Sequence, residues 1–215
     1  MSMLTRLGLV WCLAGGAVVH GSTQDPTKTL PEAYQLQFDN DYVRVVRAHY
    51  AAGAKLPDHA HPPGTTVYVY LNDSEGVVFA HSGRINRSVT RPPVKTGAVR
   101  IAGGDEEHHT AENPASTPSD FLRIVLKTDT AGERNPRRRL SPTDAEFVNR
   151  QMRITRVSAP TSNVTWIETP DGQPSLLVEL PSGNTRWYDA GQRVAPTVLH
   201  NPAELIRIDF LTPPK

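Results

Sequence analysis

Short apolar runs with alternating side chains recur along most of the chain. They are rich in β-branched and aromatic residues, and glycine, proline, asparagine and aspartate separate them. The clearest runs lie at residues 42–50, 66–71, 76–80, 98–102 and 121–127. Many short strands bounded by turn residues predict an antiparallel sandwich or barrel. Within residues 66–71, alternation places Val67 and Val69 on one face of a sheet and the two intervening tyrosines on the other.

The last third of the chain repeats the pattern of the first part. Residues 149–156 (NRQMRITR) match residues 40–47 (NDYVRVVR) through one asparagine and two arginines in the same places. The tripeptide Asn-Pro-Ala precedes an apolar run both at residues 113–115 and at residues 201–203. Because internal repeats outweigh local propensity as an indication of fold, we predict an all-β protein built from two tandem copies of one unit.

The first 21 residues have the pattern of a targeting segment. Arg6 precedes an uncharged apolar stretch at residues 7–19, and small residues follow. This stretch is shorter than the about 20 apolar residues that a membrane-spanning helix needs. We therefore predict a secretory signal peptide at residues 1–21 and a periplasmic or secreted protein, with an uncleaved membrane anchor as the alternative. The single cysteine, Cys12, lies inside this segment, which removes thiol chemistry from the mature chain.

A basic, proline-bearing stretch at residues 129–145 separates the two copies. Its run of Arg137, Arg138 and Arg139 is either a small anion-binding patch or, as we favour, part of a solvated connector. Just beyond it, the pair Thr143 and Glu146 has the spacing of a helix N-terminus and predicts one short helical turn.

Two histidines, His59 and His61, lie one residue apart just before the run at residues 66–71. In extended backbone, residues two apart project to the same face, so both imidazoles can point at one centre. Neutral imidazoles bind divalent transition metals, and a catalytic site needs a third ligand and an open position. The candidates for the third ligand are His108 and His109, of which only one can enter the site because neighbouring strand residues face opposite ways.

These two segments resemble the two sequence motifs of the cupin family. In the first motif a glycine and five residues precede His-x-His, as they do from Gly53 to His61. In the second motif a glycine begins a strand, and a histidine, three further residues and an asparagine end it. Gly97 matches that start, and His109 and Asn113 match that end. The similarity to the motifs covers about residues 40–127.

The resemblance implies a double-stranded β-helix, or jelly-roll barrel, with a metal deep in the barrel mouth. It implies His59, His61 and His109 as the metal ligands, with His108 and Glu107 as alternates. It places residues 36–128 in a metal-binding cupin domain and residues 146–215 in a degenerate second unit. Residues 22–35 remain as a polar N-terminal segment.

The chain departs from the family pattern in three ways. The position of the family's glutamate ligand falls on Thr66 or Thr65. The Gly-Gly turn before the second histidine pair is one residue longer than in the family. The second copy has lost the metal-site histidines, with Glu168, Pro170 and Thr197 near their positions and only His200 remaining nearby.

Three imidazoles without a carboxylate leave a metal more electrophilic and more open. Some cupin dioxygenases resemble this arrangement with ferrous iron, so we predict one divalent transition metal, with Fe(II) favoured and Zn, Mn, Ni or Cu as alternatives. The predicted function is a metal-dependent oxygenase acting on a small organic molecule. A metal-dependent isomerase or hydrolase, or a non-catalytic small-molecule or metal-binding module, is the alternative.

The composition sets limits on the partners. Lysine and arginine together number 23 and aspartate and glutamate 22, so the net charge favours neither nucleic acid nor an anionic membrane surface as a partner. The sequence contains no phosphate loop, nucleophile elbow or nucleotide-binding fingerprint, and it assigns no catalytic side chain. Exposed sheet edges often pair, which makes a homodimer a further prediction.

Overall fold

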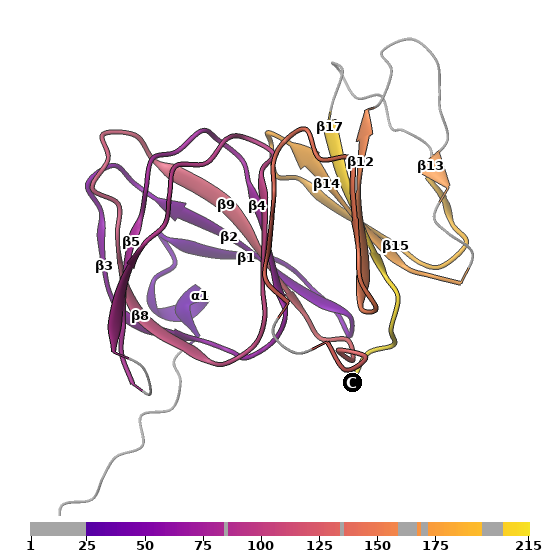
Figure 1. Ribbon diagram of the computed structural model, residues 1–215, viewed down its shortest axis with the longest axis horizontal. Helices are drawn as coiled ribbons and strands as arrows, with labels where there is room; N and C mark the ends of the chain where they lie inside the picture. The colour runs from indigo at the N-terminus through magenta and orange to yellow at the C-terminus, as the bar shows by residue number, and fades with distance from the viewer. Residues whose placement is uncertain (1–24, 84–85, 134–135, 159–166, 169–171, 195–203) are drawn as a thin grey trace, which may run out of the picture.

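The computed structural model describes residues 25–83, 86–133, 136–158, 167–168, 172–194 and 204–215 (Figure 1). The predicted signal peptide and the second-copy positions Pro170, Thr197 and His200 lie outside the described residues, as does the side chain of Glu168. Nearly all regular elements of the described chain are strands, and every pairing in its sheets is antiparallel, which confirms the predicted all-β fold. Within this part of the chain, no helix has the length and apolar character needed to cross a bilayer.

The first half forms a barrel from two facing sheets (Figure 1). The six-stranded sheet has the order β1-β2-β9-β4-β7-β10, and the four-stranded sheet has the order β3-β8-β5-β6. The strands of the six-stranded sheet are β1 (Tyr34–Asp39), β2 (Val43–Tyr50), β4 (Thr66–Tyr70), β7 (Val99–Ala102), β9 (Ser119–Leu126) and β10 (Arg138–Leu140). Those of the other sheet are β3 (Lys55–His61), β5 (Val78–His81), β6 (Arg87–Thr90) and β8 (Glu107–Glu112).

The second half forms a five-stranded sheet with the order β11-β12-β17-β14-β15 and a separate two-stranded ribbon. The sheet contains β11 (Glu146–Val148), β12 (Met152–Ser158), β14 (Ser175–Leu180), β15 (Thr185–Tyr188) and β17 (Glu204–Phe210). The ribbon pairs β13 (Ile167–Glu168) with β16 (Arg193–Val194). The one helix of the described residues, α1 (Pro26–Thr29), precedes β1.

Two local predictions from the sequence are wrong. The helical turn expected near Thr143 is absent, because Glu146–Val148 is a strand paired with β12. The arginine run is more than a solvated connector, because Arg138–Leu140 is the edge strand β10, and Arg139 lies opposite Arg100 of β7. In both places a distant strand satisfies the backbone hydrogen bonds, and local propensity does not contain that information.

The six-stranded sheet is buried on both faces. On one face, Val67 and Val69 of β4 join Leu122 of β9 in the largest apolar cluster. On the other face, Tyr68 and Phe121 of the same two strands belong to a second cluster inside the barrel. The alternation predicted for residues 66–71 is therefore confirmed, and the tyrosine face is the one that lines the barrel.

The second half of the chain covers the valine face of this sheet. Ile154, Leu176 and Ile206 of the five-stranded sheet belong to the same cluster as Val67 and Leu122, and each is 2% exposed or less. Burying apolar area of this kind contributes about 25 cal/mol for each Å² removed from water. The barrel interior is thereby kept for polar side chains.

The structure explains why position 97, which begins the segment similar to the second cupin motif, is a glycine. Its φ is +79°, a conformation that residues with a Cβ rarely adopt. A Cβ there would lie 3.1 Å from Cδ1 of Leu180 in the five-stranded sheet. The Gly97 carbonyl also accepts a hydrogen bond from the guanidinium of Arg156, so the turn before β7 is fitted to the second half of the chain.

We expect Leu122→Ala to lower the free energy of unfolding by about 3 kcal/mol, because truncating a fully buried leucine loses transfer energy and leaves a cavity. Leu36, which is 49% exposed on β1, provides the matched control. Leu36→Ala should change the free energy by no more than about 0.5 kcal/mol. Urea unfolding of both variants measures the difference, and equal effects would contradict the packing of the two halves against each other.

Candidate metal centre

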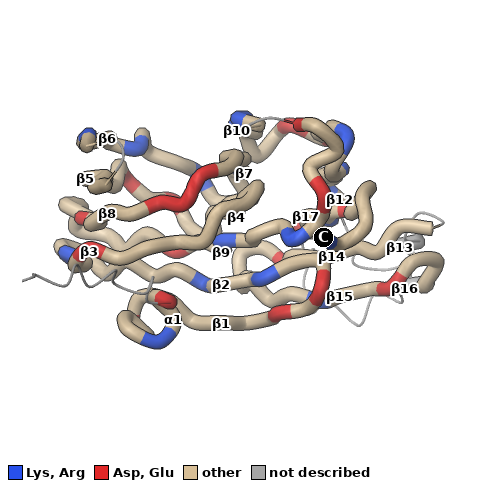
Figure 2. The backbone as a smooth tube through the Cα atoms, turned by 90° about the horizontal axis from the view of Figure 1, so that it is seen from below, with Lys and Arg blue, Asp and Glu red and all other residues tan. Residues whose placement is uncertain are grey.

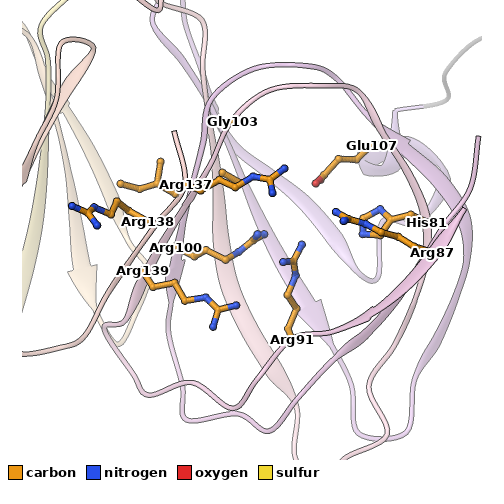
Figure 3. Close-up of a pocket in the computed structure, with 11 residues that line it drawn as sticks. His81, Arg87, Arg91, Arg100, Gly103, Glu107, Arg137, Arg138 and Arg139 are labelled. Carbon is orange, nitrogen blue, oxygen red and sulfur yellow. The ribbon is translucent and has the colours of Figure 1, made fainter. Parts of the chain in front are cut away.

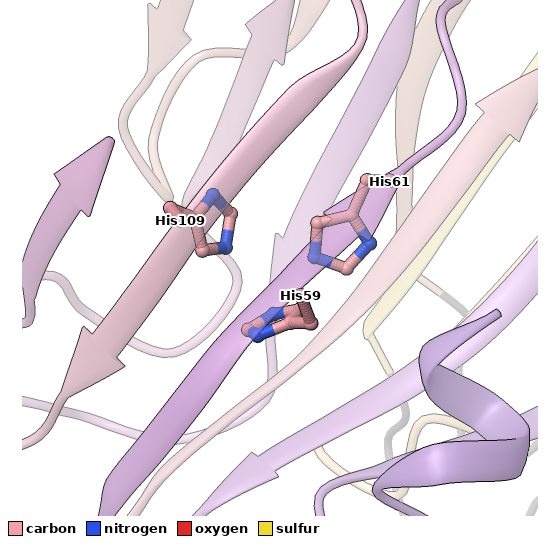
Figure 4. A group of neighbouring side chains, drawn as sticks. All are labelled: His59, His61 and His109. Carbon is pink, nitrogen blue, oxygen red and sulfur yellow. The ribbon is translucent and has the colours of Figure 1, made fainter. Parts of the chain in front are cut away.

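Three buried histidines meet inside the barrel (Figure 4). His59 and His61 lie on β3, and pairing with β8 places His109 directly opposite His59. One ring nitrogen of each lies within 4.8 Å of those of the other two. The residues are 7%, 4% and 3% exposed, respectively. The His-x-His spacing and the strand pairing therefore bring three imidazoles to one point.

The alternates suggested by the sequence lie elsewhere. His108 lies opposite Ala60, and its half-exposed side chain places Nε2 3.4 Å from a carboxylate oxygen of Glu106. Glu107 lies opposite His61, but it is not part of the group within 4.8 Å. Its carboxylate lies instead 3.5 Å from the Tyr68 hydroxyl. The structure thus brings His109, rather than His108 or Glu107, to the other two histidines.

The site has no carboxylate where the cupin pattern has its glutamate. Thr65 and Thr66 are both buried, and the Thr66 hydroxyl hydrogen-bonds the Gly64 carbonyl at 3.4 Å. A threonine hydroxyl is neutral, so these positions bring no negative charge to the histidines. The three imidazoles remain a neutral donor set.

Burial sets the protonation of these histidines. Desolvation lowers the pKa of His59, and it lowers the pKa of His61 well below its usual value, with help from the positive charge of Arg123. Desolvation and the neighbouring imidazoles lower the pKa of His109 to about 2. All three rings are therefore neutral at ordinary pH, which is the form that binds a metal.

Hydrogen bonds orient His59. Its Nδ1 lies 2.8 Å from the Pro57 carbonyl, so Nδ1 carries the proton and donates it. Its Nε2 is then an acceptor, and the Tyr34 hydroxyl donates to it at 2.7 Å. Tyr50 lies 2.6 Å from the same hydroxyl. With the proton on Nδ1, the lone pair that His59 could offer to a metal is on Nε2, and metal binding there would replace the hydrogen bond from Tyr34.

Tyr34 was missed by the sequence analysis, which placed it in a polar N-terminal segment. The domain boundary predicted at residue 36 falls inside β1, and Tyr34 is only 1% exposed. The available signal was the alternation of Tyr34, Leu36 and Phe38 with polar residues, which is typical of a strand. That alternation does not indicate that the Tyr34 hydroxyl contacts a histidine.

His81 also lies beside the site, although its sequence context suggested an ordinary strand histidine. It is paired with His109 across β5 and β8, and the two rings are 5.4 Å apart. Its Nε2 is buried without a hydrogen-bond partner among the described residues. His81 does not belong to the group within 4.8 Å, so it borders the centre rather than forming it.

The three histidines fit a divalent transition metal. Both ring nitrogens of His109 are buried without a hydrogen-bond partner in the described part of the chain. Leaving a buried polar atom unpaired costs about 1–3 kcal/mol, which a bound metal would offset. Imidazole nitrogens lie about 2.0–2.1 Å from zinc, so two on one metal are at most about 4.2 Å apart. The 4.8 Å limit within which the three nitrogens lie is larger than this distance, so metal binding requires the rings to move closer together.

Comparisons with known proteins show a shared fold. No protein-family model and no curated protein matches the sequence. The pirin YhhW from Escherichia coli, solved with nickel(II), is similar with a TM-score of 0.54 at 13% identity, over 85% of this chain and 91% of that one. YhaK from Escherichia coli gives a TM-score of 0.54 at 13% identity, over 83% and 91%. Quercetin 2,3-dioxygenase from Acinetobacter baumannii gives 0.52 at 10% identity, over 80% and 75%.

The protonation of His109 predicts a pH-dependent stability of the metal-free protein. Its pKa is about 2 in the folded state, against about 6.5 in the unfolded chain. Between these values the unfolded state binds one more proton, so the free energy of unfolding falls by about 1.4 kcal/mol for each pH unit of acidification. We expect His109→Gln to remove this contribution and to give a shallower dependence below about pH 6.5.

Urea unfolding in the presence of a chelator, between about pH 7.5 and pH 4.5, measures this dependence. His49→Gln, which changes an exposed histidine of β2 outside the histidine group, is the matched control. Parallel curves for wild type and His109→Gln would show that His109 is not held neutral by burial.

Proposed function

Because the chain has the cupin fold, we propose that its barrel holds one divalent transition metal on His59, His61 and His109. The observation that carries the proposal is the meeting of three neutral, buried imidazoles, one of which has no hydrogen-bond partner in the described part of the chain. Fe(II) is our first choice, and nickel, zinc, manganese and copper are the alternatives. The nickel(II) in the structurally similar pirin supports a divalent metal without deciding its identity.

We propose further that the metal serves an enzyme acting on a small organic molecule, with oxygenase chemistry favoured over isomerisation or hydrolysis. A metal at this centre would supply Lewis-acid chemistry and, if it is iron, redox chemistry. The fold shared with a quercetin dioxygenase supports this reading at the level of the scaffold. Three protein ligands leave positions open, as a catalytic site requires.

The chain's own residues would shape the reaction space. Phe79 and Phe121 pack beside the histidines and the tyrosines and exclude water from that wall. The Tyr34 hydroxyl oxygen lies 2.7 Å from Nε2 of His59 and donates a hydrogen bond to that nitrogen. Tyr50, hydrogen-bonded to Tyr34 and itself 2% exposed, fixes that hydroxyl.

A non-catalytic binding module is the second candidate, and one observation favours it. The cavity that touches both His61 and His109 has a volume of about 20 Å³. This is room for about one water molecule and not for an organic substrate. If the protein is an enzyme, its substrate must therefore be held mainly in a larger space beside this cavity.

We also propose export to the periplasm or beyond, followed by assembly into a homodimer. The short apolar stretch at residues 7–19 supports export. The strands β1 and β10 end the six-stranded sheet and provide edges at which two copies could pair. N-terminal sequencing of the protein from the cell envelope, with light scattering of the same sample, tests both.

We expect the protein, purified without a metal-affinity tag and reconstituted with iron, nickel or zinc, to hold about one metal ion per chain. His59→Ala and His109→Ala should each weaken binding by more than the roughly 10- to 100-fold that loss of a supporting residue costs. Elemental analysis after gel filtration measures the bound metal, and its identity narrows the reaction class.

His108→Gln is the matched control, because this neighbouring histidine is half-exposed and faces away from the centre. It should keep the wild-type metal content. A wild type that stays empty after reconstitution, or metal retained by both alanine variants, would rule out the proposed centre.

A further inference from the structure

A second, larger cavity opens beside the metal centre and is lined mainly by arginines (Figure 3). Its volume is about 430 Å³, which lies in the range of pockets for small molecules. The arginines come from strands far apart in the sequence, namely from β6 and the residue after it, from β7 and from β10. They are Arg87, Arg91, Arg100, Arg137, Arg138 and Arg139. Figure 2 shows β6 and β10, with their basic residues, along the same side of the molecule.

Strand pairing aims these side chains at one space. Arg139 lies opposite Arg100 in the β10–β7 pair, so both leave the sheet on the same face. Arg138 lies opposite Ile101, and Figure 3 shows its guanidinium turned away from the others. The guanidinium groups of Arg91, Arg100 and Arg139 point toward a common region. The cluster therefore results from the fold of β10 back onto β7.

Among the described residues that line this cavity, arginines outnumber acidic side chains. Glu107 is the one acidic residue among the described residues that line it, and its carboxylate also lies 3.9 Å from Arg123 in the barrel. The Nε atoms of Arg91 and Arg100 are buried without a hydrogen-bond partner in the described chain. Burial and the nearby charge of Arg100 lower the pKa of Arg91, as repulsion between close cations requires.

Aromatic rings hold two of these guanidinium groups in place. Arg100 lies over the ring of Tyr68 at 4.0 Å, and Arg91 lies over the ring of Phe79 at 5.6 Å. A guanidinium stacked on a ring keeps its N–H edge free to form paired hydrogen bonds with a planar or tetrahedral oxyanion. The guanidinium groups of Arg91 and Arg100 are thus held in positions from which they can bind an anion.

The arginine cavity adjoins the small cavity at the metal centre. The small cavity at His61 and His109 shares lining residues with it, namely His81, Arg91, Arg100 and Glu107. A ligand held in the larger space can therefore extend one end toward the histidines. This arrangement supplies the room that the metal centre itself lacks.

We propose that the substrate or ligand of this protein is a small organic molecule with a multivalent oxyanion, either a phosphate or several carboxylates. The arginines bind the oxyanion, and the remainder of the molecule reaches toward the three histidines. The second part rests on the proposed metal centre, whereas the binding of the anion does not. The recessed position of Arg91 and Arg100 favours a small molecule over a nucleic acid, whose backbone would need an open basic groove.

The test is calorimetric titration of the metal-free full chain with inorganic pyrophosphate and, separately, with citrate. We expect saturable binding of at least one probe, weakened by added salt as charge pairing requires. Arg100→Gln and Arg139→Gln should each weaken it by roughly tenfold or more, because each removes a charge-assisted hydrogen bond. Preference for pyrophosphate would assign a phosphate, and preference for citrate would assign carboxylates.

Arg150→Gln, which changes an exposed arginine outside the cavity, is the matched control and should bind like the wild type. Arg139 lies on an exposed edge strand, so its variant tests the proposal even if Arg100→Gln fails to fold. Absence of binding by both probes, binding that both cavity variants retain, or tighter binding of a single-stranded oligonucleotide would overturn the proposal.

The metal content of Arg139→Gln separates this proposal from the metal centre. It should equal that of the wild type, because Arg139 lies outside the histidine group. Anion binding in a chain that holds no metal would leave the anion site standing and remove the metalloenzyme. Metal binding without anion binding would leave the metal centre standing and remove the proposed anion site.

Discussion

Burial of one sheet on both of its faces is the constraint on which the rest of this structure depends. Strand β9 lies between β2 and β4, and its side chains alternate between the apolar cluster shared with the second half and the barrel interior. Because Leu122 and Ile124 are sealed by the five-stranded sheet, the opposite face is free to carry tyrosines and to look onto histidines. The second half of the chain thus supports the sheet that faces the site, although none of its described residues belongs to the three-histidine group.

The same burial determines the chemistry of the centre. Inside a barrel closed to water, the charged form of an imidazole is disfavoured, so His59, His61 and His109 present lone pairs rather than positive charge. The Tyr34 hydroxyl, itself hydrogen-bonded to Tyr50, donates to Nε2 of His59, while the ring nitrogens of His109 have no hydrogen-bond partner among the described residues. A neutral donor set with an unsatisfied member is an environment suited to a cation.

Next to this neutral centre, the fold gathers cations. Pairing of β10 with β7 brings Arg139 to Arg100, and Arg91 joins them from the end of β6. Stacking on Tyr68 and Phe79 holds the guanidinium groups of Arg100 and Arg91 in place. The lining that results is rich in hydrogen-bond donors and positive charge, which suits an anionic ligand.

The sequence by itself determined the all-β fold, the alternation of β4 and the choice of His59, His61 and one later histidine, because these follow from periodicities of two residues and from a motif of fixed spacing. The motif spacing to Asn113 already favoured His109 over His108, and the strand pairing brings His109 to the other two. Tertiary structure alone decided that Tyr34, His81 and the arginine run lie beside the centre. Those contacts depend on which strands pair across long stretches of chain. Local propensity and residue spacing do not predict such long-range pairings.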